Sequence, residues 1–436
     1  LPKADAALLL TFFAFITTMF IWANSSPGAS VQSFVSAGGT MTQMPTFAVF
    51  SLVGTIRDMW RANDQSLSVL IALLSGVWPY LKLGLLFACV LVPYKKMGRD
   101  VQGRLAICLD ALGKWSLLDA YVLMMMTVAF RLTIQTPAED TDGVFGPLSA
   151  DVYVKPEIGC YTFLYATVVS LVACHVLLAL QRLAWGVRVP AGGAKSALAD
   201  SPANDPATKG TFARRAFYHL VTANLVLCLA THVLGGLLPN FIFKFYGVTA
   251  KVMDGGDVRV FSLTSLASHF VENSLPLFWG SRYHLLIGFL LFSYVMPMLH
   301  VLGCLVLWRA KLTPRQRFYW LVFTEVTFAW AAGDVFVFSV LASLWQIERF
   351  ALFVVGDKCD ALTPILARHF SDFLDGDARC FDLKTELGYG IWVFAFSCVL
   401  FNVMGRFVIR KAKLSLEKDG EGGAQEATLE SHAVIA

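Results

Sequence analysis

The chain has 436 residues, of which 56% are hydrophobic and only 15% are charged, and its formal net charge is +4. A typical soluble domain is about 25% charged, so the polar side chains here are too few to cover a surface in contact with water. The Lys and Arg residues lie beside apolar segments and form no single basic surface, which argues against binding to nucleic acid. The composition predicts a polytopic membrane protein whose surface is partly covered by lipid.

Eight segments of the chain are apolar enough, and long enough at about 20 residues, to cross a membrane as helices. Clusters of Lys and Arg follow every second segment, and such clusters mark cytoplasmic loops. The connection over 136–158 is acidic instead and is expected on the opposite side. We therefore expect both termini in the cytoplasm. The expected spans are 6–23, 67–92, 115–135, 159–183, 220–238, 285–307, 321–345 and 387–409.

Short motifs recur in the same order in the two halves of the chain, which indicates a duplicated four-helix unit in parallel orientation. Segment 6–23 taken alone resembles a signal peptide, but it has a counterpart in the second half, and we take it as a retained span. The matched motifs are Phe50-Ser51-Leu52 with Phe261-Ser262-Leu263, Pro79-x-Leu81-Lys82 with Pro297-x-Leu299-His300, Trp115-x3-Asp119 with Trp330-x3-Asp334, and Glu157-Ile158-Gly159 with Glu386-Leu387-Gly388.

Two stretches of the chain are poor in apolar residues and cannot bury enough surface to order themselves. The fold class expected from these patterns is an all-α membrane protein of eight transmembrane helices in two tandem four-helix (tetraspan) repeats, with small β elements in the outside loops. The expected parts are a first four-helix domain over 1–186, a cytoplasmic linker over 187–215, a second four-helix domain over 216–412 and a disordered cytoplasmic tail over 413–436.

Four ionisable residues within the expected spans are candidates for function, because a charge in a membrane costs about 2.5–3.5 kcal/mol on insertion scales. Lys82 and Asp119 are expected to pair in the first unit, and His300 and Asp334 in the second. A His–Asp pair can titrate near neutral pH, which makes the second unit the better candidate for proton coupling. Both pairs can equally be read as fixing helix packing only.

Other residues have structural interpretations. Pro79 and Pro297 lie inside spans and are expected to kink their helices, which either opens a lateral cleft or leaves a static bend. Trp115 and Trp330 are read as interfacial anchors. Segment 97–113 has an amphipathic pattern and is expected on the membrane surface. Two cysteines share a polar loop expected on the non-cytoplasmic side and are predicted to form a disulfide: Cys359 and Cys380.

The sequences Trp78-Pro79-Tyr80-Leu81-Lys82 and Trp115-Ser116-Leu117-Leu118-Asp119-Ala120-Tyr121, with Trp330 and Asp334 as a second copy, resemble the paraquat-inducible protein A family, the PqiA/LetA-like integral membrane proteins. The resemblance covers most of 6–186 and 217–410 and implies two four-helix domains. It also implies work with a periplasmic lipid-binding partner of the MCE type in moving lipids between membranes. The zinc ribbons common in that family are missing here, which leaves the partner and the cargo open.

The sequence favours a transporter-like protein that takes part in trafficking of lipid or another hydrophobic molecule. Its expected partners are membrane lipids and a protein on the non-cytoplasmic face, with no nucleic acid. The alternative is a non-transporting scaffold or accessory subunit, which should keep its function when Lys82 and Asp334 are neutralised. Sequence motifs of hydrolases, zinc proteases and nucleotide-binding enzymes do not occur, so we expect no catalytic residue, no cofactor and no metal.

Overall fold

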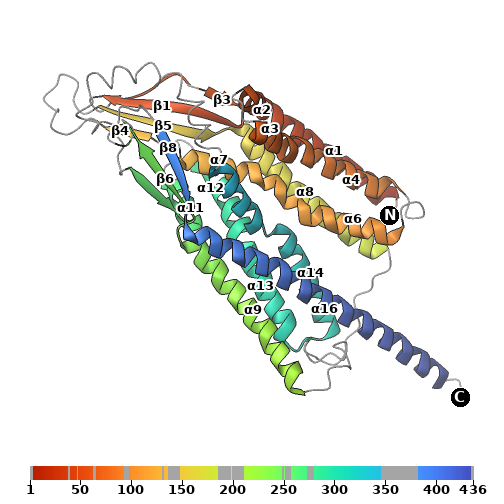
Figure 1. The fold of residues 1–436 in the computed structure, drawn as a ribbon. Helices are drawn as coiled ribbons and strands as arrows, with labels where there is room; N and C mark the ends of the chain where they lie inside the picture. Colours follow the sequence, from red (N-terminus) through yellow and green to blue (C-terminus); the bar gives the residue numbers. More distant parts are fainter. Residues whose placement is uncertain are drawn as a thin grey trace.

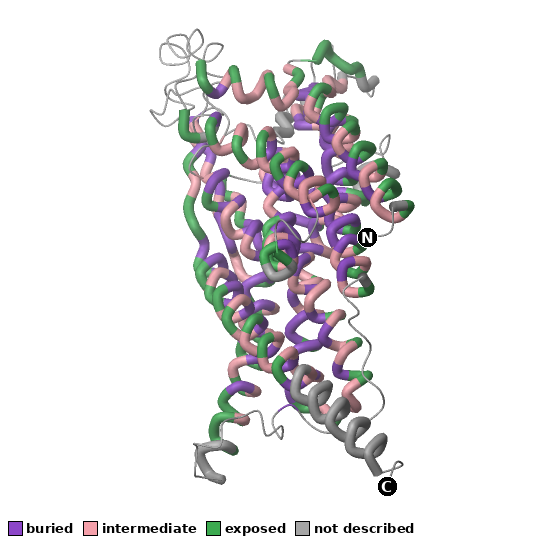
Figure 2. The backbone as a smooth tube through the Cα atoms, turned by 90° about the vertical axis from the view of Figure 1, so that its right-hand side faces the viewer, coloured by how far each residue is buried: buried purple, intermediate pink, exposed green. Residues whose placement is uncertain are grey.

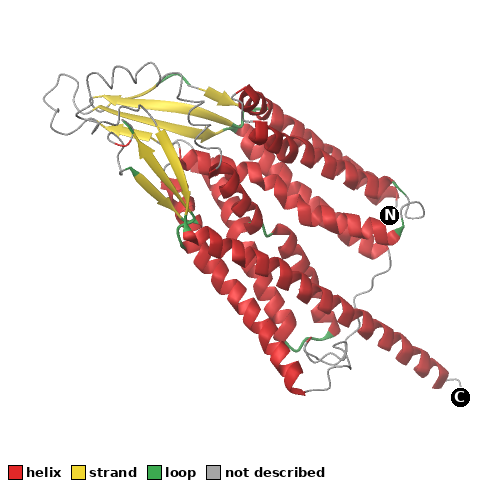
Figure 3. Ribbon diagram, viewed as in Figure 1, coloured by secondary structure: helices red, strands yellow, loops and turns green. Residues whose placement is uncertain are grey.

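Long helices form a bundle in the computed structural model, and the β strands gather at one end of it (Figure 1). The chain termini, carried by α1 and α16, lie at the other end. Figure 3 shows the same division into a helical part and a strand part. The structure describes residues 3–37, 40–46, 48–61, 65–92, 98–129, 132–135, 148–184, 198, 211–247, 250, 257–272, 279–344 and 382–433.

The first half of the chain alternates apolar helices with short strands. Its elements are α1 (Lys3–Ser25), β1 (Ala29–Ala37), β2 (Thr40–Gln43), β3 (Ala48–Phe50), α2 (Leu52–Arg61), α3 (Gln65–Ile71), the π-helix η1 (Ala72–Val77), α4 (Trp78–Leu91), α6 (Arg99–Leu112), the 3₁₀-helix η2 (Gly113–Leu117), α7 (Leu118–Ala129), β4 (Leu132–Gln135), β5 (Leu148–Pro156) and α8 (Ile158–Ala184).

The second half has a similar order of elements, and its helix α14 begins at a capping box. Thr313 accepts a hydrogen bond from the Gln316 amide, and the Gln316 side chain accepts one from the Thr313 amide. The elements are α9 (Thr211–Leu237), β6 (Phe241–Tyr246), β7 (Val258–Phe261), α11 (Leu263–Glu272), α12 (Trp279–Leu290), the π-helix η6 (Leu291–Val295), α13 (Met296–Arg309), α14 (Pro314–Trp330), helical residues 333–344, β8 (Asp382–Leu387) and α16 (Tyr389–Ala433).

In the described part of the chain, seven helices are long and apolar enough to cross a membrane. Each of them overlaps one of the eight expected spans. Their outward sides carry exposed large apolar residues, such as Trp22 on α1 and Trp392 on α16, and Figure 2 shows exposed and buried positions alternating along the long helices. The seven are Ala4–Ser25, Ser68–Leu91, Ile158–Leu183, Arg215–Leu237, Tyr283–Arg309, Pro314–Leu344 and Tyr389–Leu416.

The expected span 115–135 is not among these helices. Residues 113–117 are 3₁₀-helical, α7 has only 12 residues, and residues 132–135 form the strand β4. Segment 97–113 also differs from its expected place on a membrane surface, because α6 packs against α4, α8 and α14. The buried residues of α6 include Gln102, Ala106 and Asp110, so its amphipathic pattern reflects packing against other helices.

A π-helix precedes both prolines that were expected to distort their helices. Pro79 follows η1, and Pro297 follows η6. A proline has no amide hydrogen, and its ring clashes with the carbonyl four residues earlier, so the wider π turn relieves the clash. In a π pattern the Phe292 carbonyl would accept from residue 297, and it accepts instead from the Ala332 amide, at 2.8 Å.

Two small antiparallel sheets lie beside each other at the strand end of the bundle (Figure 1). The sequence predicts small β elements in the loops, and strands occur in both halves, among them β3 and β7. One sheet has the order β2-β1-β5-β4, with β3 also paired to β1, and the other has the order β7-β6-β8. Residues Ala29 and Phe241 open the central strands β1 and β6, and their partners are Phe50 and Phe261 respectively.

The sheet register corrects one of the repeat motifs. Ala29 pairs with Pro156 and Phe241 with Leu387, so the residue that corresponds to Glu157 is Gly388. Hydrogen bonds agree, because Gly159 and Gly390 each donate to the proline carbonyl that precedes the central strand. The match of Glu157 with Glu386 is therefore displaced by two residues.

The ends of the expected domains also differ in the structure. The helix α9 begins at Thr211, inside the expected linker. The helix α16 continues to Ala433, where a disordered tail from residue 413 was expected. Leu, Glu, Lys, Gln and Ala favour helix, and their abundance in this stretch outweighs its glycines. The other linker residues lie outside the described part, except for residue 198.

Candidate binding cavity and polar junction

A cavity of about 150 Å³ lies at the strand end of the first half. It is lined by the ends of α1, α7 and α8, by residues of β1, β3, β5, α2 and α3, and on one side by Ala342 and Ser343 of the second half. Most of the lining is apolar, including Ala29, Met59 and Met126. An apolar lining of this kind favours a hydrophobic ligand, because few polar groups would lose water on binding.

Asp119 is the one acidic side chain among the described residues that line the cavity. It lies in the first turn of α7, where the helix dipole favours negative charge. Its hydrogen-bond partner is the Ser75 side chain, in the widened turn of η1. Within the described residues no Lys or Arg pairs with Asp119, so the predicted Lys82–Asp119 pair is wrong.

Lys82 has other partners. Its side chain is 1% exposed, and its ammonium donates to Ser170 on α8 at 3.0 Å. Gly113 leaves the space for it, since a Cβ atom at Gly113 would lie 2.5 Å from the ammonium nitrogen. Asp110 and Cys174 also interact with Lys82 electrostatically. The ammonium thus lies among α4, α6, η2 and α8, and it faces Asp110 in place of Asp119.

Asp334, the expected partner of His300, pairs across the two halves instead. Its carboxylate lies 2.8 Å from the Lys114 ammonium of η2, and Lys114 also donates to the Ala331 carbonyl at 2.8 Å. Ala331 ends α14, and the helix break leaves that carbonyl without an intrahelical partner. One lysine therefore joins the first half to the broken helix of the second.

His300 is fully buried and does not contact Asp334 in the described structure. Its Nδ1 lies 2.9 Å from the Thr324 carbonyl, and its Nε2 lies 3.3 Å from the Cys304 thiol. The predicted His300–Asp334 pair is therefore wrong. A histidine held by a carbonyl and a thiol is satisfied as a neutral side chain, which removes the basis for assigning proton coupling to this pair.

Trp115 and Trp330 lie where the halves meet and not as separate interfacial anchors. The Trp115 ring packs edge-on against Phe338, at 5.4 Å between centroids. The Trp330 indole donates to Nε2 of His175 at 2.7 Å. Since an indole N–H only donates, Nε2 is unprotonated, and the Nδ1 hydrogen of His175 faces the Asp110 carboxylate at 3.4 Å.

A third charged contact lies nearer the ends that carry the termini. Glu325 on α14 accepts from Arg182 of α8 and lies 2.6 Å from the Lys413 ammonium of α16. Glu325 thus ties the last helices of both halves together. With the Lys114–Asp334 pair and the Trp330–His175–Asp110 chain, it forms what we call the polar junction.

The predicted Cys359–Cys380 disulfide lies outside the described residues and stays a prediction. The cysteines that are described are free thiols. The described residues include no group of His, Cys, Asp or Glu suited to hold a metal ion.

Sequence reasoning missed several residues of these sites. Ser75, the partner of Asp119, lies four residues before Pro79, and the second half repeats this spacing with Ser293 before Pro297, a signal that was available in the sequence. Lys114 and Glu325 carry no such signal, because their partners lie 220 and 143 positions away and only the fold brings them together.

One segment of the first half is similar to a known family. Residues 6–135 match the family model described as Paraquat-inducible protein A. The matched PqiA segment contains the cavity residue Asp119, together with Lys82 and Lys114, and ends at β4. No curated protein and no solved structure matches the chain. The apolar helices and the PqiA match together identify an integral membrane protein.

Proposed function

We propose that the protein is a transporter-like membrane protein that takes a lipid or another hydrophobic molecule into the cavity of its first half. The single observation that supports this most is the apolar cavity itself, which lies at the strand end of membrane-length helices. Such a place lets a molecule leave the bilayer without crossing water. The two sheets at the same end offer a surface for a protein partner on the non-cytoplasmic side.

The proposal includes two tandem units and an eighth crossing. Residues 99–129 lead through α6, η2 and α7 from the end with the termini to the end with the strands (Figure 1). Their charged side chains keep these residues from forming a purely apolar span, but α6 and η2 pack against α4, α8 and α14. A crossing shielded by other helices can carry polar residues that lipid would not tolerate. With this crossing both termini lie on the cytoplasmic side.

The test is to fill the cavity. Ala29 is 5% exposed and lines it, so Ala29→Phe places a ring in the space that a ligand would take. We expect this variant, purified in lipid nanodiscs, to lose most binding of a fluorescent single-chain lipid probe and to carry less co-purified lipid in native mass spectrometry. Ala14→Phe adds the same ring at an exposed position of α1 and should leave both measurements unchanged.

The alternative is a membrane scaffold or accessory subunit, and the polar junction is the observation that favours it. Three charged or hydrogen-bonded contacts hold the halves together, which is what a rigid scaffold needs. A scaffold has no use for the cavity. Equal probe binding by the wild-type protein, Ala29→Phe and Ala14→Phe would therefore reject the transport proposal and leave the scaffold.

A further inference from the structure

The two halves use corresponding positions differently, and the strand register shows which positions correspond. Ala29 and Phe241 occupy the same place, since each pairs with a phenylalanine of the neighbouring strand on one side. The helices α2 and α11 start at Leu52 and Leu263, two residues after those phenylalanines. Corresponding residues of α2 and α11 can therefore be compared directly.

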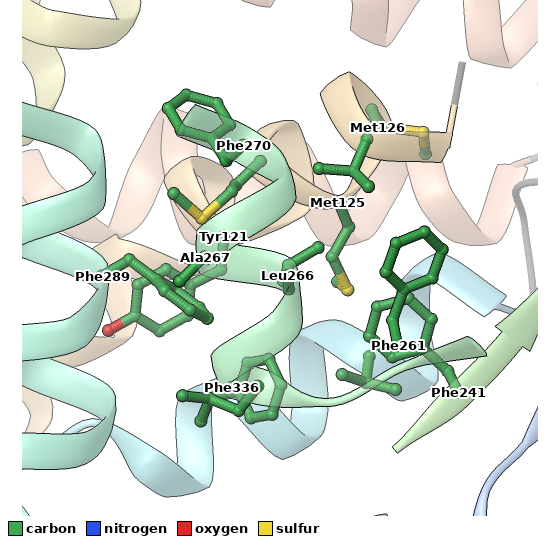
Figure 4. Close-up of a cluster of buried hydrophobic side chains, with 14 of the residues drawn as sticks. Tyr121, Met125, Met126, Phe241, Phe261, Leu266, Ala267, Phe270, Phe289 and Phe336 are labelled. Carbon is green, nitrogen blue, oxygen red and sulfur yellow. The ribbon is translucent and has the colours of Figure 1, made fainter. Parts of the chain in front are cut away.

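Larger side chains occupy the second half at the positions that line the cavity in the first. Phe241 stands in place of Ala29, Leu266 in place of Thr55, and Phe270 in place of Met59. The three large residues are 0–2% exposed. In Figure 4 they lie among the side chains of one packed cluster, with Phe261 and Phe336 beside them. Side chains thus fill in the second half the place where the first half has a cavity.

The corresponding carboxyl groups of the two halves, Asp119 and Asp334, differ in whether a charged side chain of the protein pairs with them. Asp334 has the Lys114 ammonium at 2.8 Å, so a positive charge of the protein already satisfies it. Asp119 has only the Ser75 hydroxyl as a partner in the described part of the chain, and it faces the cavity. A carboxyl group in an apolar wall is costly unless a hydrogen-bond donor or a cation meets it.

Besides Asp119, the cavity wall has a buried hydroxyl group, that of Ser343, which has no hydrogen-bond partner in the described structure. Ser343 is 2% exposed, its hydroxyl makes no hydrogen bond in the described structure, and it lines the cavity. Buried hydroxyl groups normally find a partner, so an unpartnered one in a cavity wall indicates a ligand group. The mostly apolar cavity wall thus offers the Asp119 carboxyl group and the unpartnered Ser343 hydroxyl group to a ligand.

We infer that the cargo binds in the cavity of the first half, which Ser343 of the second half completes, and that the cargo is a single-chain amphiphile whose head group donates hydrogen bonds, as an ammonium or a hydroxyl does. This inference rests on the proposed function. The head group meets Asp119 and Ser343, and the beginning of the chain meets the apolar lining. A cavity of about 150 Å³ accommodates a molecule of about the size of benzene. It therefore holds the polar end of one chain and excludes the paired chains of a phospholipid.

The experiment compares head groups on one chain length. Hexadecylamine, hexadecanol, methyl palmitate and palmitate each compete with a fluorescent hexadecyl-ammonium probe for the protein in phosphatidylcholine nanodiscs. Binding to the lipid itself is subtracted with Ala29→Phe, whose cavity is filled. We expect hexadecylamine to bind about tenfold more tightly than methyl palmitate, in keeping with a hydrogen bond to a charged group, with hexadecanol between them and palmitate weakest.

Two variants test whether Asp119 and Ser343 cause this order of affinities. Asp119→Asn keeps the shape of the side chain and should reduce the preference for hexadecylamine to less than about threefold. Ser343→Ala should weaken hexadecanol and leave the Asp119 contact in place. Glu386→Gln removes an exposed carboxyl group of the second half, on β8, and is the control that should keep the wild-type ranking.

The outcomes separate the inference from the proposed function. Binding of all four compounds with equal affinity, or tighter binding of palmitate, overturns the inference and leaves the proposed function standing. An unchanged ranking in Asp119→Asn overturns it as well. If none of the compounds binds above the Ala29→Phe background, the proposed function fails and the inference fails with it.

Discussion

Removing one partner of the Lys114–Asp334 pair should destabilise the protein unequally, depending on which partner is removed. At the observed 2.8 Å, two unit charges attract by about 6 kcal/mol at an effective dielectric constant of 20. Desolvation of both groups offsets much of this. Asp334→Asn leaves the Lys114 ammonium buried, with its side chain 5% exposed, and should cost about 3–5 kcal/mol.

Lys114→Met should cost less, because the Asp334 side chain that remains is 27% exposed and reaches water. The expected loss is about 1–3 kcal/mol, most of it from the Ala331 carbonyl that loses its donor. The double variant should cost less than the sum of the single variants, with a coupling of at least about 1 kcal/mol.

Equilibrium unfolding in mixed micelles, followed by tryptophan fluorescence, measures these free energies. The matched control is the exposed Lys244–Glu386 pair between β6 and β8, where neutral replacements should have little effect. Additive losses at Lys114 and Asp334, or a larger loss for Lys114→Met than for Asp334→Asn, would refute the reasoning about burial.

Two further changes test the packing and the topology. Gly113→Ala should destabilise the protein by about 1–3 kcal/mol, because its Cβ atom would meet the buried Lys82 ammonium. Gly84→Ala, with open space around it, should be neutral or slightly stabilising in the same unfolding assay. Cysteines placed at the exposed residues Leu414 and Val258 should lie on opposite sides of the membrane. A membrane-impermeant thiol reagent applied to intact cells should modify only the cysteine at Val258, and modification of Leu414→Cys would reverse the proposed orientation.

The sequence predicts the apolar helices of this fold well, because hydropathy over about 20 residues is a local property. It fails at α6 and α7, where neighbouring helices shield the charged residues and the apolar run is short. The prolines predict a distortion, but not its form. That form depends on Ala332, which donates to Phe292 from the helix break 40 positions further along the chain.

The candidate site was predicted only in part. Lys82, Asp119 and Asp334 are indeed held by specific contacts, but each has a partner that the sequence did not indicate. Pairing by position within a repeat assumed that each unit satisfies its own charges. Asp334 instead takes its partner, Lys114, from the other half, and a pair separated by 220 positions has no local pattern to reveal it.

The contacts of Lys114 and Phe292 meet on a single peptide group. The Ala331 carbonyl and the Ala332 amide belong to the same rigid plane, and the oxygen is held by Lys114 while the nitrogen is held by Phe292. Rotation of this plane breaks both bonds at once. A tilt of the first half that moves Lys114 away therefore also weakens the hydrogen bond from Ala332 to Phe292. This peptide group thus couples the turn before Pro297 to the position of the first half.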